Sequence, residues 1–186
     1  RPEEMLVAPE LNDPIVDTTH AIAEVDRAVD FILKDRAIQQ LSLIGYSWGS
    51  AICGRYAGEF ESKVSRLVLS GALWVEKGAT PRTISADIGA YRTVDAGSMA
   101  KRWATGLSGD EIDAIVPPAR VSRWCSDTVL VDPIGDKSGL LRAPTGVLKD
   151  FMNYSHTGEP WYKPREILAP TQVVVGELDK ETTPEQ

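Results

Sequence analysis

Apolar residues recur along the chain at two different spacings, and each spacing predicts a different element. Between residues 18 and 34 they recur every three or four positions, which predicts a helix with one buried face. Asp17 or Thr18 can cap the start of this helix, and the proline-rich residues 1–16 before it are predicted as loop. The apolar positions of the helix are Ile22, Val25, Val29, Ile32 and Leu33.

Three apolar runs, at residues 41–45, 64–70 and 171–175, predict strands. The apolar character of the first run is continuous rather than alternating, as is typical of a parallel strand that is covered on both faces. Residues 50–57 can form a helix between the first two strands, and a strand–helix–strand unit predicts a parallel pair with a right-handed crossover. The expected fold class is therefore α/β, a mostly parallel sheet with helices on both faces.

The stretch from residue 75 to residue 168 differs from both ends of the chain, because seven prolines break it into short pieces. It is predicted to form helices over residues 83–92, 96–105 and 108–115, the last of which begins with a capping-box pattern. We expect this stretch to be a helical cap inserted over the edge of the sheet. The expected domains are a first core segment at 1–74, the cap at 75–168 and a second core segment at 169–186.

The first predicted strand runs into the pentapeptide Gly45-Tyr46-Ser47-Trp48-Gly49, a G-x-S-x-G pattern between a strand and a helix. In that context a serine occupies a strained turn, which exposes its hydroxyl at the carboxyl end of the strand. Small residues are expected on both sides, because a side chain at Gly45 or Gly49 would collide with the crossing helix or strand. Ser47 is therefore the candidate nucleophile, and the following helix would present N–H groups and a positive dipole end to an oxyanion. A structural glycine-rich turn is the alternative.

A carboxylate follows the last predicted strand, in the run Gly176-Glu177-Leu178-Asp179. The carboxyl ends of parallel strands meet at one rim of the sheet, so Asp179 is expected on the same rim as Ser47. That is the place for an acid that orients a catalytic base. The alternative is an aspartate that only caps a turn before Pro184.

The order of these elements resembles the α/β-hydrolase superfamily: elbow strand, elbow helix, next strand, cap insertion, then a strand ending in Gly-x-x-Asp. The resemblance implies that Ser47 is the nucleophile, that the Trp48 N–H belongs to the oxyanion hole, and that Asp179 is the acid of a Ser-His-Asp triad. The Ser-Trp-Gly-Ser run is also similar to the elbow of prolyl iminopeptidases and related capped esterases. Arg1-Pro2 resembles the end of the Gly-x-Ser-x-Arg-Pro stretch of that family.

Two features of the family pattern are not matched. The catalytic histidine of the family lies beyond the Gly-x-x-Asp strand, and its second oxyanion donor lies on an early strand-to-helix loop. We expect both outside these 186 residues, which would then be the middle of a longer protein. Of the two histidines present, His20 is expected on the solvent side of its helix and His156 in a surface loop. His156 is a weak alternative as the base.

Composition narrows the possible partners. The chain is 42% hydrophobic and 25% charged with a net charge of −7, which is ordinary for a globular protein and argues against nucleic acid and anionic membranes. No apolar run reaches the length of a membrane span, and residues 1–4 do not resemble a signal peptide. Two cysteines, Cys53 and Cys125, make no disulfide framework; this is compatible with a reducing compartment and slightly favours the cytoplasm. Cys53 is expected to be a small buried thiol.

No cofactor or metal is expected, because the sequence has no phosphate-cradling glycine loop and no zinc-ligand spacing. Asp132 and Asp136 are predicted to lie in turns, in the sequences Asp-Pro and Gly-Asp. The acids Glu177, Asp179 and Glu181 alternate after a strand, a pattern that is more typical of solvated carboxylates than of a cation site.

The function that these observations favour is a serine hydrolase acting on an ester, lactone or amide of a small, partly apolar molecule. Tyr46, Trp74, Trp103 and Trp124 are candidates for substrate contact, although packing is the favoured role of each tryptophan taken singly. One alternative is a non-catalytic α/β-hydrolase-like protein or inactive fragment that binds a ligand under the cap. A prolyl iminopeptidase is a further alternative, and it would need an acidic site for the amino group of its substrate. The sequence does not indicate an oligomeric state.

Overall fold

The computed structural model describes residues 3–74 and 88–182 of the chain, and these divide into two compact units. Each unit is built from two segments of chain. Residues 3–15 and 88–145 form the first unit, and residues 16–74 and 146–182 form the second. The cap predicted at 75–168 is thus divided at Thr145, and its role in covering the sheet stays a prediction.

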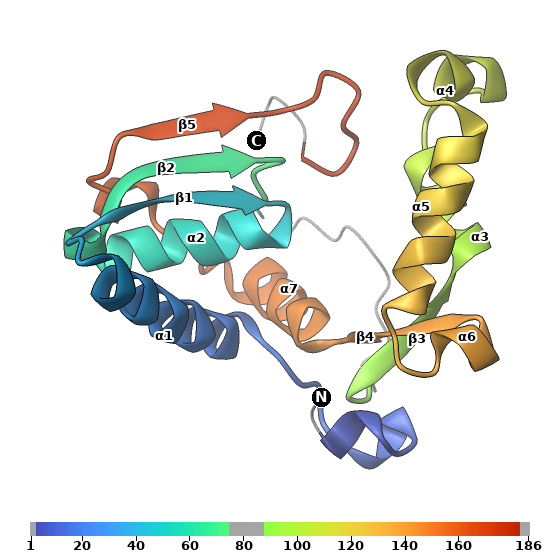
Figure 1. Ribbon diagram of the computed structural model, residues 1–186, viewed down its shortest axis with the longest axis horizontal. Coiled ribbons are helices and arrows are strands. Elements are labelled where there is room, and N and C mark those ends of the chain that lie inside the picture. The colour runs from blue at the N-terminus through green and yellow to red at the C-terminus, as the bar shows by residue number, and fades with distance from the viewer. Residues whose placement is uncertain (1–2, 75–87, 183–186) are drawn as a thin grey trace. The chain divides into compact units, whose positions relative to one another are not determined.

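The second unit contains a three-stranded parallel sheet, made of β1 (Leu41–Tyr46), β2 (Val64–Ser70) and β5 (Thr171–Val174). The strand order is β1-β2-β5, with Gly45 opposite Leu69 and Ser70 opposite Val174. All three strands point the same way in Figure 1. The predicted α/β class, the three predicted strands and their parallel pairing are therefore confirmed.

The helices of the second unit contact one another in turn, and one of them packs on the sheet. Helix α2 (Trp48–Glu59) lies along β1 and β2, α1 (Thr18–Arg36) packs on α2, and α7 (Gly146–Thr157) contacts α1 (Figure 1). Two short 3-10 helices complete the unit, η3 (Glu61–Lys63) and η4 (Pro164–Glu166). The fully or nearly buried core residues are Ala21, Ile22, Val29, Ala51, Ile52, Cys53, Tyr56, Ala57, Val64, Leu67, Leu69, Trp161 and Tyr162.

Helix α1 forms where the periodicity predicts it. Asp17 caps it by accepting a 2.9 Å hydrogen bond from the backbone N–H of His20, and Ala37 ends it in the left-handed conformation. A buried side chain then ties α2 to α1, because the Tyr56 hydroxyl donates to Asp26 over 2.8 Å. Lys63 donates to the same carboxylate over 2.7 Å, so both helices and η3 meet at one acceptor.

Strand β1 is less buried than its apolar sequence predicts. Side chains alternate between the two faces of a strand, and Leu41, Leu43 and Gly45 share the face that α2 covers. Ile44 and Tyr46, which point to the other face, are 75% and 73% exposed. The continuous apolar run therefore does not indicate burial on both faces here.

The first unit pairs a small antiparallel sheet with short helices. Strand β3 (Tyr91–Asp95) pairs with β4 (Leu140–Pro144). The helices are α3 (Ala96–Trp103), α4 (Gly109–Ile115), α5 (Pro118–Leu130) and α6 (Gly135–Ser138), with the 3-10 helices η1 (Glu3–Met5) and η2 (Pro9–Leu11) in the segment predicted as loop. The capping box before α4 is confirmed, with Ser108 and Glu111 bonding each other reciprocally.

The helix predicted at 83–92 is wrong where the structure describes it. Residues 88–90 are irregular and β3 begins at Tyr91, because Tyr91, Thr93 and Val94 favour a strand that pairs with the distant β4. Residues 83–87 lie outside the described residues. The predicted helices at 96–105 and 108–115 are confirmed as α3 and α4, each slightly shorter than expected.

A buried ion pair holds the first unit together. Asp132 is 2% exposed and accepts hydrogen bonds from Nε and Nη2 of Arg142, at 3.0 and 2.8 Å. Arg142 also donates to the Met5 carbonyl, which ties the N-terminal segment to β4. The sequence predicts that Asp132 lies in an ordinary turn. It does accept a turn hydrogen bond from the Ile134 N–H, but its main partner is Arg142, ten residues away, which donates from its side chain and from its backbone N–H.

Candidate active site

The Ser47 backbone occupies a conformation that is rare for a residue with a side chain. Its φ of 52° and ψ of −121° lie outside the regions that L-residues favour, and such a conformation costs roughly 1–3 kcal/mol. Ser47 lies between the end of β1 and the start of α2, and its N–H donates to the Ser70 carbonyl over 2.9 Å. The chain therefore turns sharply here and presents the serine at the carboxyl rim of the sheet.

Close packing of strand against helix explains the first glycine of the pentapeptide. A Cβ atom added to Gly45 would lie 2.3 Å from the carbonyl oxygen of Gly49 and 2.8 Å from Cα of Ser50. The same addition at Gly49 would meet no heavy atom within 4 Å beyond its two chain neighbours and the nearby backbone of its own helix. The expectation of a collision is confirmed for Gly45 and wrong for Gly49, because Gly49 contributes the crowded backbone while its own Cβ direction is open.

Trp48 begins α2 and is anchored by its side chain. The first turn of a helix leaves its N–H groups without partners inside the helix, so the Trp48 N–H is the kind of donor an oxyanion hole needs. The indole Nε1 donates to Thr18 Oγ1 over 3.1 Å, and the fully buried Thr18 in turn donates its backbone N–H to Asp150 on α7 over 2.6 Å. Trp48 is thereby tied to the start of α1.

Asp179 lies in a turn that supplies hydrogen-bond donors to its carboxylate. Oδ1 accepts from the backbone N–H groups of Glu181 and Thr182, at 2.8 and 2.9 Å, and Oδ2 accepts from the Thr182 hydroxyl at 2.5 Å. Burial raises the pKa of Asp179, but these hydrogen bonds outweigh burial and hold the pKa below its ordinary value. The group is therefore an anion at neutral pH. A carboxylate has about four acceptor positions, so three donors leave room for a histidine N–H.

The turn after β2 brings Asp179 close to the elbow. Gly71 follows β2 with a φ of +54°, and its N–H donates to the Val174 carbonyl over 2.8 Å. A Cβ placed on Gly71 would lie 3.7 Å from Cε2 of Tyr46 and 3.8 Å from Oδ2 of Asp179. The carboxylate and the residue before Ser47 thus flank one glycine, as the common rim of parallel strands predicts.

Neither histidine makes a hydrogen bond to Ser47 within the described ranges. His20 lies in the first turn of α1, where its Nδ1 pairs with Asp17 at 2.7 Å and its side chain is 77% exposed. His156 is exposed in the last turn of α7. Both are confirmed as surface residues, but the loop predicted for His156 is wrong, because α7 extends through it to Thr157.

Comparison with known proteins identifies the family. Residues 9–118, more than half of the chain, match the model of the alpha/beta hydrolase fold family. The chain belongs to the α/β-hydrolase fold family.

Among solved structures, this α/β-hydrolase chain is similar to a monoacylglycerol lipase from Paleococcus ferrophilus, at 19% identity and a TM-score of 0.53. The match covers 91% of the chain and 58% of the lipase, so the chain spans little more than half the length of that protein. It is also similar to MGS-M2, an alpha/beta hydrolase enzyme from a Medee basin deep-sea metagenome library. That match has 16% identity and a TM-score of 0.43, and covers 91% of the chain and 57% of the enzyme. No curated protein matches the chain.

The aromatic candidates for substrate contact are separated between the two units. In the second unit, Tyr46 is 73% exposed on the rim, and Trp74 packs edge-on against Tyr162 with ring centroids 5.4 Å apart. In the first unit, Trp103 and Trp124 pack on each other at 5.0 Å and remain 47% and 45% exposed. Packing partners therefore exist for all three tryptophans, and substrate contact stays a prediction.

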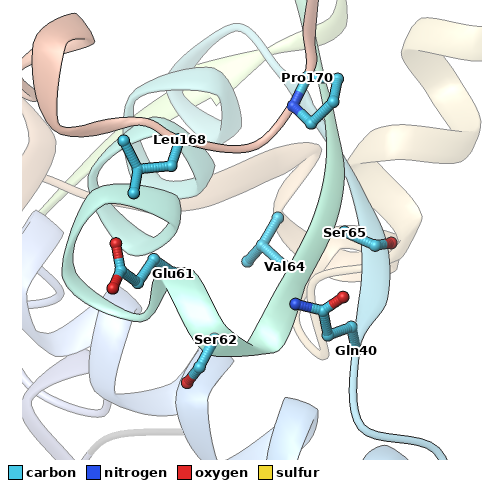
Figure 2. Close-up of a pocket in the computed structure, with 7 residues that line it drawn as sticks. All are labelled: Gln40, Glu61, Ser62, Val64, Ser65, Leu168 and Pro170. Carbon is cyan, nitrogen blue, oxygen red and sulfur yellow. The ribbon is translucent and has the colours of Figure 1, made fainter.

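The pocket drawn in Figure 2 lies at the opposite rim from Ser47. It has a volume of about 350 Å³, and its lining includes Gln40, Val64 and Pro170, which precede or begin the three strands at their amino ends. Because Ser47 follows the carboxyl end of β1, this pocket does not belong to the candidate active site. Among the described residues no cluster of His, Cys, Asp and Glu is arranged to hold a metal ion, and no helix is long and apolar enough to cross a membrane.

Sequence reasoning missed residues that hold the site in place. Ser50 is completely buried, and its hydroxyl donates to the Ser47 carbonyl over 2.5 Å. Thr182 supplies two of the three hydrogen bonds to Asp179. A signal existed in both cases: a serine three residues into a helix can bond back to the preceding turn, and Asp-x-x-Thr is a pattern of capped turns. Cys53 is buried as predicted, and burial raises the pKa of its thiol.

Proposed function

We propose that this protein is a serine hydrolase that cleaves an ester, lactone or amide of a small, partly apolar molecule, most specifically a carboxylic ester. The observation that carries the proposal is the strained backbone of Ser47 at the sharp turn from β1 to α2. Folding alone would favour glycine at a φ of 52° with a ψ of −121°, which lies outside the left-handed region that Ala37 occupies, so a serine there indicates a use for its hydroxyl. The family membership supports the same chemistry.

In the proposed reaction, Ser47 Oγ attacks the carbonyl carbon of the substrate and forms a tetrahedral intermediate. The Trp48 N–H, at the start of α2, donates to the oxygen that becomes negative. The leaving group departs with a proton, and an acyl-enzyme remains on Ser47. Water then attacks the acyl carbon and gives its proton to the base. The acid is released, and Ser47 Oγ regains a proton from the base.

A base must take the proton from Ser47 Oγ, because a neutral serine hydroxyl is a weak nucleophile. We assign this role to a histidine outside the 186 residues, and assign Asp179 to accept its second N–H. Two features support Asp179 in this role: its pKa is held low, and its carboxylate lies beside Gly71 at the same rim as Tyr46. An ionised acid in this place would fix the tautomer of the imidazole and stabilise its protonated form.

A fluorophosphonate probe tests the proposal, because it phosphonylates only an activated serine. The full-length protein is expected to be labelled once, and Ser47→Ala is expected to abolish both the label and hydrolysis of short p-nitrophenyl esters. Ser42→Ala is the matched control, since Ser42 lies on β1, the strand that leads to Ser47, and is exposed. Labelling that persists in Ser47→Ala would refute the assignment of the nucleophile.

A ligand-binding protein without catalytic activity is the second candidate. The observation that favours it is that, in the part of the chain that the structure describes, neither histidine bonds to Ser47. A full-length protein that folds but is not labelled by the fluorophosphonate would support this candidate over the hydrolase.

A further inference from the structure

The Ser50 side chain links two parts of the second unit at the elbow. Ser50 Oγ donates to the Ser47 carbonyl over 2.5 Å and accepts a 2.8 Å hydrogen bond from the backbone N–H of Leu73. The Ser50 N–H donates to the same Ser47 carbonyl over 2.8 Å. The residue is completely buried, so water does not compete for these bonds.

The carbonyl that Ser50 holds belongs to the same peptide group as the candidate oxyanion donor. A trans peptide group is planar, so the Ser47 C=O and the Trp48 N–H point in opposite directions from one rigid unit. Two hydrogen bonds that fix the carbonyl therefore also fix the direction of the N–H. The other peptide group of Ser47 is fixed as well, because the Ser47 N–H bonds to Ser70.

The same bonds also strengthen the Trp48 N–H as a hydrogen-bond donor. A hydrogen bond accepted by an amide oxygen polarises the amide and makes its N–H a better donor. The chain of bonds runs from the Leu73 N–H through the Ser50 hydroxyl and the Ser47 carbonyl to the Trp48 N–H. Each bond polarises the next so that the Trp48 N–H becomes a stronger donor to a negatively charged oxyanion.

We propose that Ser50 is a positioning residue for catalysis, which orients and polarises the Trp48 N–H toward the oxyanion through the Ser47–Trp48 peptide group. This inference rests on the proposed serine hydrolase function and adds a residue to it. A serine that bonds back three residues is common in helices and by itself is only structural. The second bond, from Leu73 after β2, distinguishes Ser50, because it makes the hydroxyl part of a chain that ends at the reacting group.

Ser50→Ala in the full-length protein tests the inference. Loss of a whole oxyanion donor costs about 10²–10³ in kcat, and Ser50→Ala would only weaken and loosen one, so we expect kcat to fall about tenfold. KM is expected to stay within about twofold, because the oxyanion forms only after the substrate has bound. Affinity for a trifluoromethyl ketone, which forms an oxyanion on Ser47, is expected to fall in parallel with kcat.

Cys53→Ala is the matched control, since Cys53 is buried on the same helix and loses the same number of side-chain atoms. Cys53→Ala is expected to lower the free energy of unfolding without changing kcat/KM. If Ser50→Ala does not fold, Ser50→Cys replaces a strong donor by a weak one and is expected to give a smaller fall in kcat.

The outcomes separate this inference from the proposed function. A wild-type protein that no fluorophosphonate labels would overturn the hydrolase proposal itself. A labelled wild type whose Ser50→Ala and Ser50→Cys variants keep the kcat and trifluoromethyl ketone affinity of the wild type would overturn only the role of Ser50. Equal losses in Cys53→Ala and Ser50→Ala would also overturn it, because both would then reflect loosened packing.

Discussion

Replacing Gly45 with alanine tests how closely β1 and α2 pack at the elbow. The added Cβ would lie 2.3 Å from O, and 2.7 Å from C, of Gly49 and 2.8 Å from Cα of Ser50. Ordinary contacts between nonbonded carbon atoms lie at about 3.5–4.0 Å, so each contact with carbon is short by at least ~0.7 Å. All three atoms belong to the backbone, and rotating a side chain cannot relieve the overlap. Helix α2 therefore has to move away from β1.

The size of the effect follows from that displacement. Overpacking in a core costs roughly 1–3 kcal/mol, and a clash with backbone belongs at the upper end, so we expect Gly45→Ala to lose at least about 2 kcal/mol of unfolding free energy. A shift of about 1 Å at Ser47 would also slow fluorophosphonate labelling by about 100-fold. Urea denaturation followed by circular dichroism measures the first effect, and the rate of labelling measures the second.

Gly49→Ala is the matched control for this prediction. It adds the same methyl group four residues away, where no heavy atom lies within 4 Å. We expect its unfolding free energy to stay within about 0.5 kcal/mol of the wild type. Equal stability of the Gly45→Ala and Gly49→Ala variants would refute the close approach of strand and helix on which the description of the elbow depends.

Two further predictions concern the acids. Asp132→Asn should lower the unfolding free energy by about 3 kcal/mol, because it leaves the buried Arg142 cation without its counter-ion, and urea denaturation measures the loss. Thr182→Val should raise the folded pKa of Asp179 by removing the hydroxyl donor, as a titration of its carboxyl ¹³C shift would show. The lowered pKa of Asp179 stabilises the folded state at pH values above the pKa that the group has in the unfolded state, about 3.9. This contribution is lost as the pH falls through the pKa of the folded state. In Thr182→Val this contribution should be smaller, and its loss should be complete at a higher pH.

Each of these predictions has a clear contrary result. Asp136→Asn serves as the control for the ion pair, because Asp136 is exposed and close in sequence to Asp132, and its replacement should change stability by less than about 0.5 kcal/mol. A similar small effect in Asp132→Asn would contradict the pairing with Arg142. An unchanged titration of Asp179 in Thr182→Val would contradict the hydrogen bond from the Thr182 hydroxyl.

The parts of the fold that were predictable from the sequence are those with local signals. The spacing of Ile22, Val25 and Val29 predicts α1, and the Asp17 cap is visible in the residue type before it. The elbow at Ser47 was predictable because glycine, serine and the strand–helix context all occur within a few residues. In each case the residues that signal the element lie close together in the chain.

The parts that were missed depend on distant partners or on ambiguous residues. Strand β3 gains its hydrogen bonds from β4, almost 50 residues later, so the strand preference of Tyr91, Thr93 and Val94 could not by itself show where the strand begins or what it pairs with. Helix α5 begins at Pro118, and a Pro-Pro pair is ambiguous in a sequence, because proline breaks most elements and yet is well suited to the first turn of a helix. The ion pair of Asp132 with Arg142 cannot be distinguished in the sequence from a turn beside a surface arginine.

The two units are interleaved along the chain, and this limits how the protein can be dissected. The polypeptide passes between them three times: after Ile15, between residues 74 and 88, and after Thr145. Excising residues 88–145 as a conventional insertion would remove Arg142 and leave the Met5 carbonyl without its donor, so the segment at 3–15 would lose its partner. Neither unit is encoded as one uninterrupted stretch, and a single cut in any one of the three connections cannot release an intact unit. Swapping the first unit between related proteins would therefore require exchanging both of its segments together.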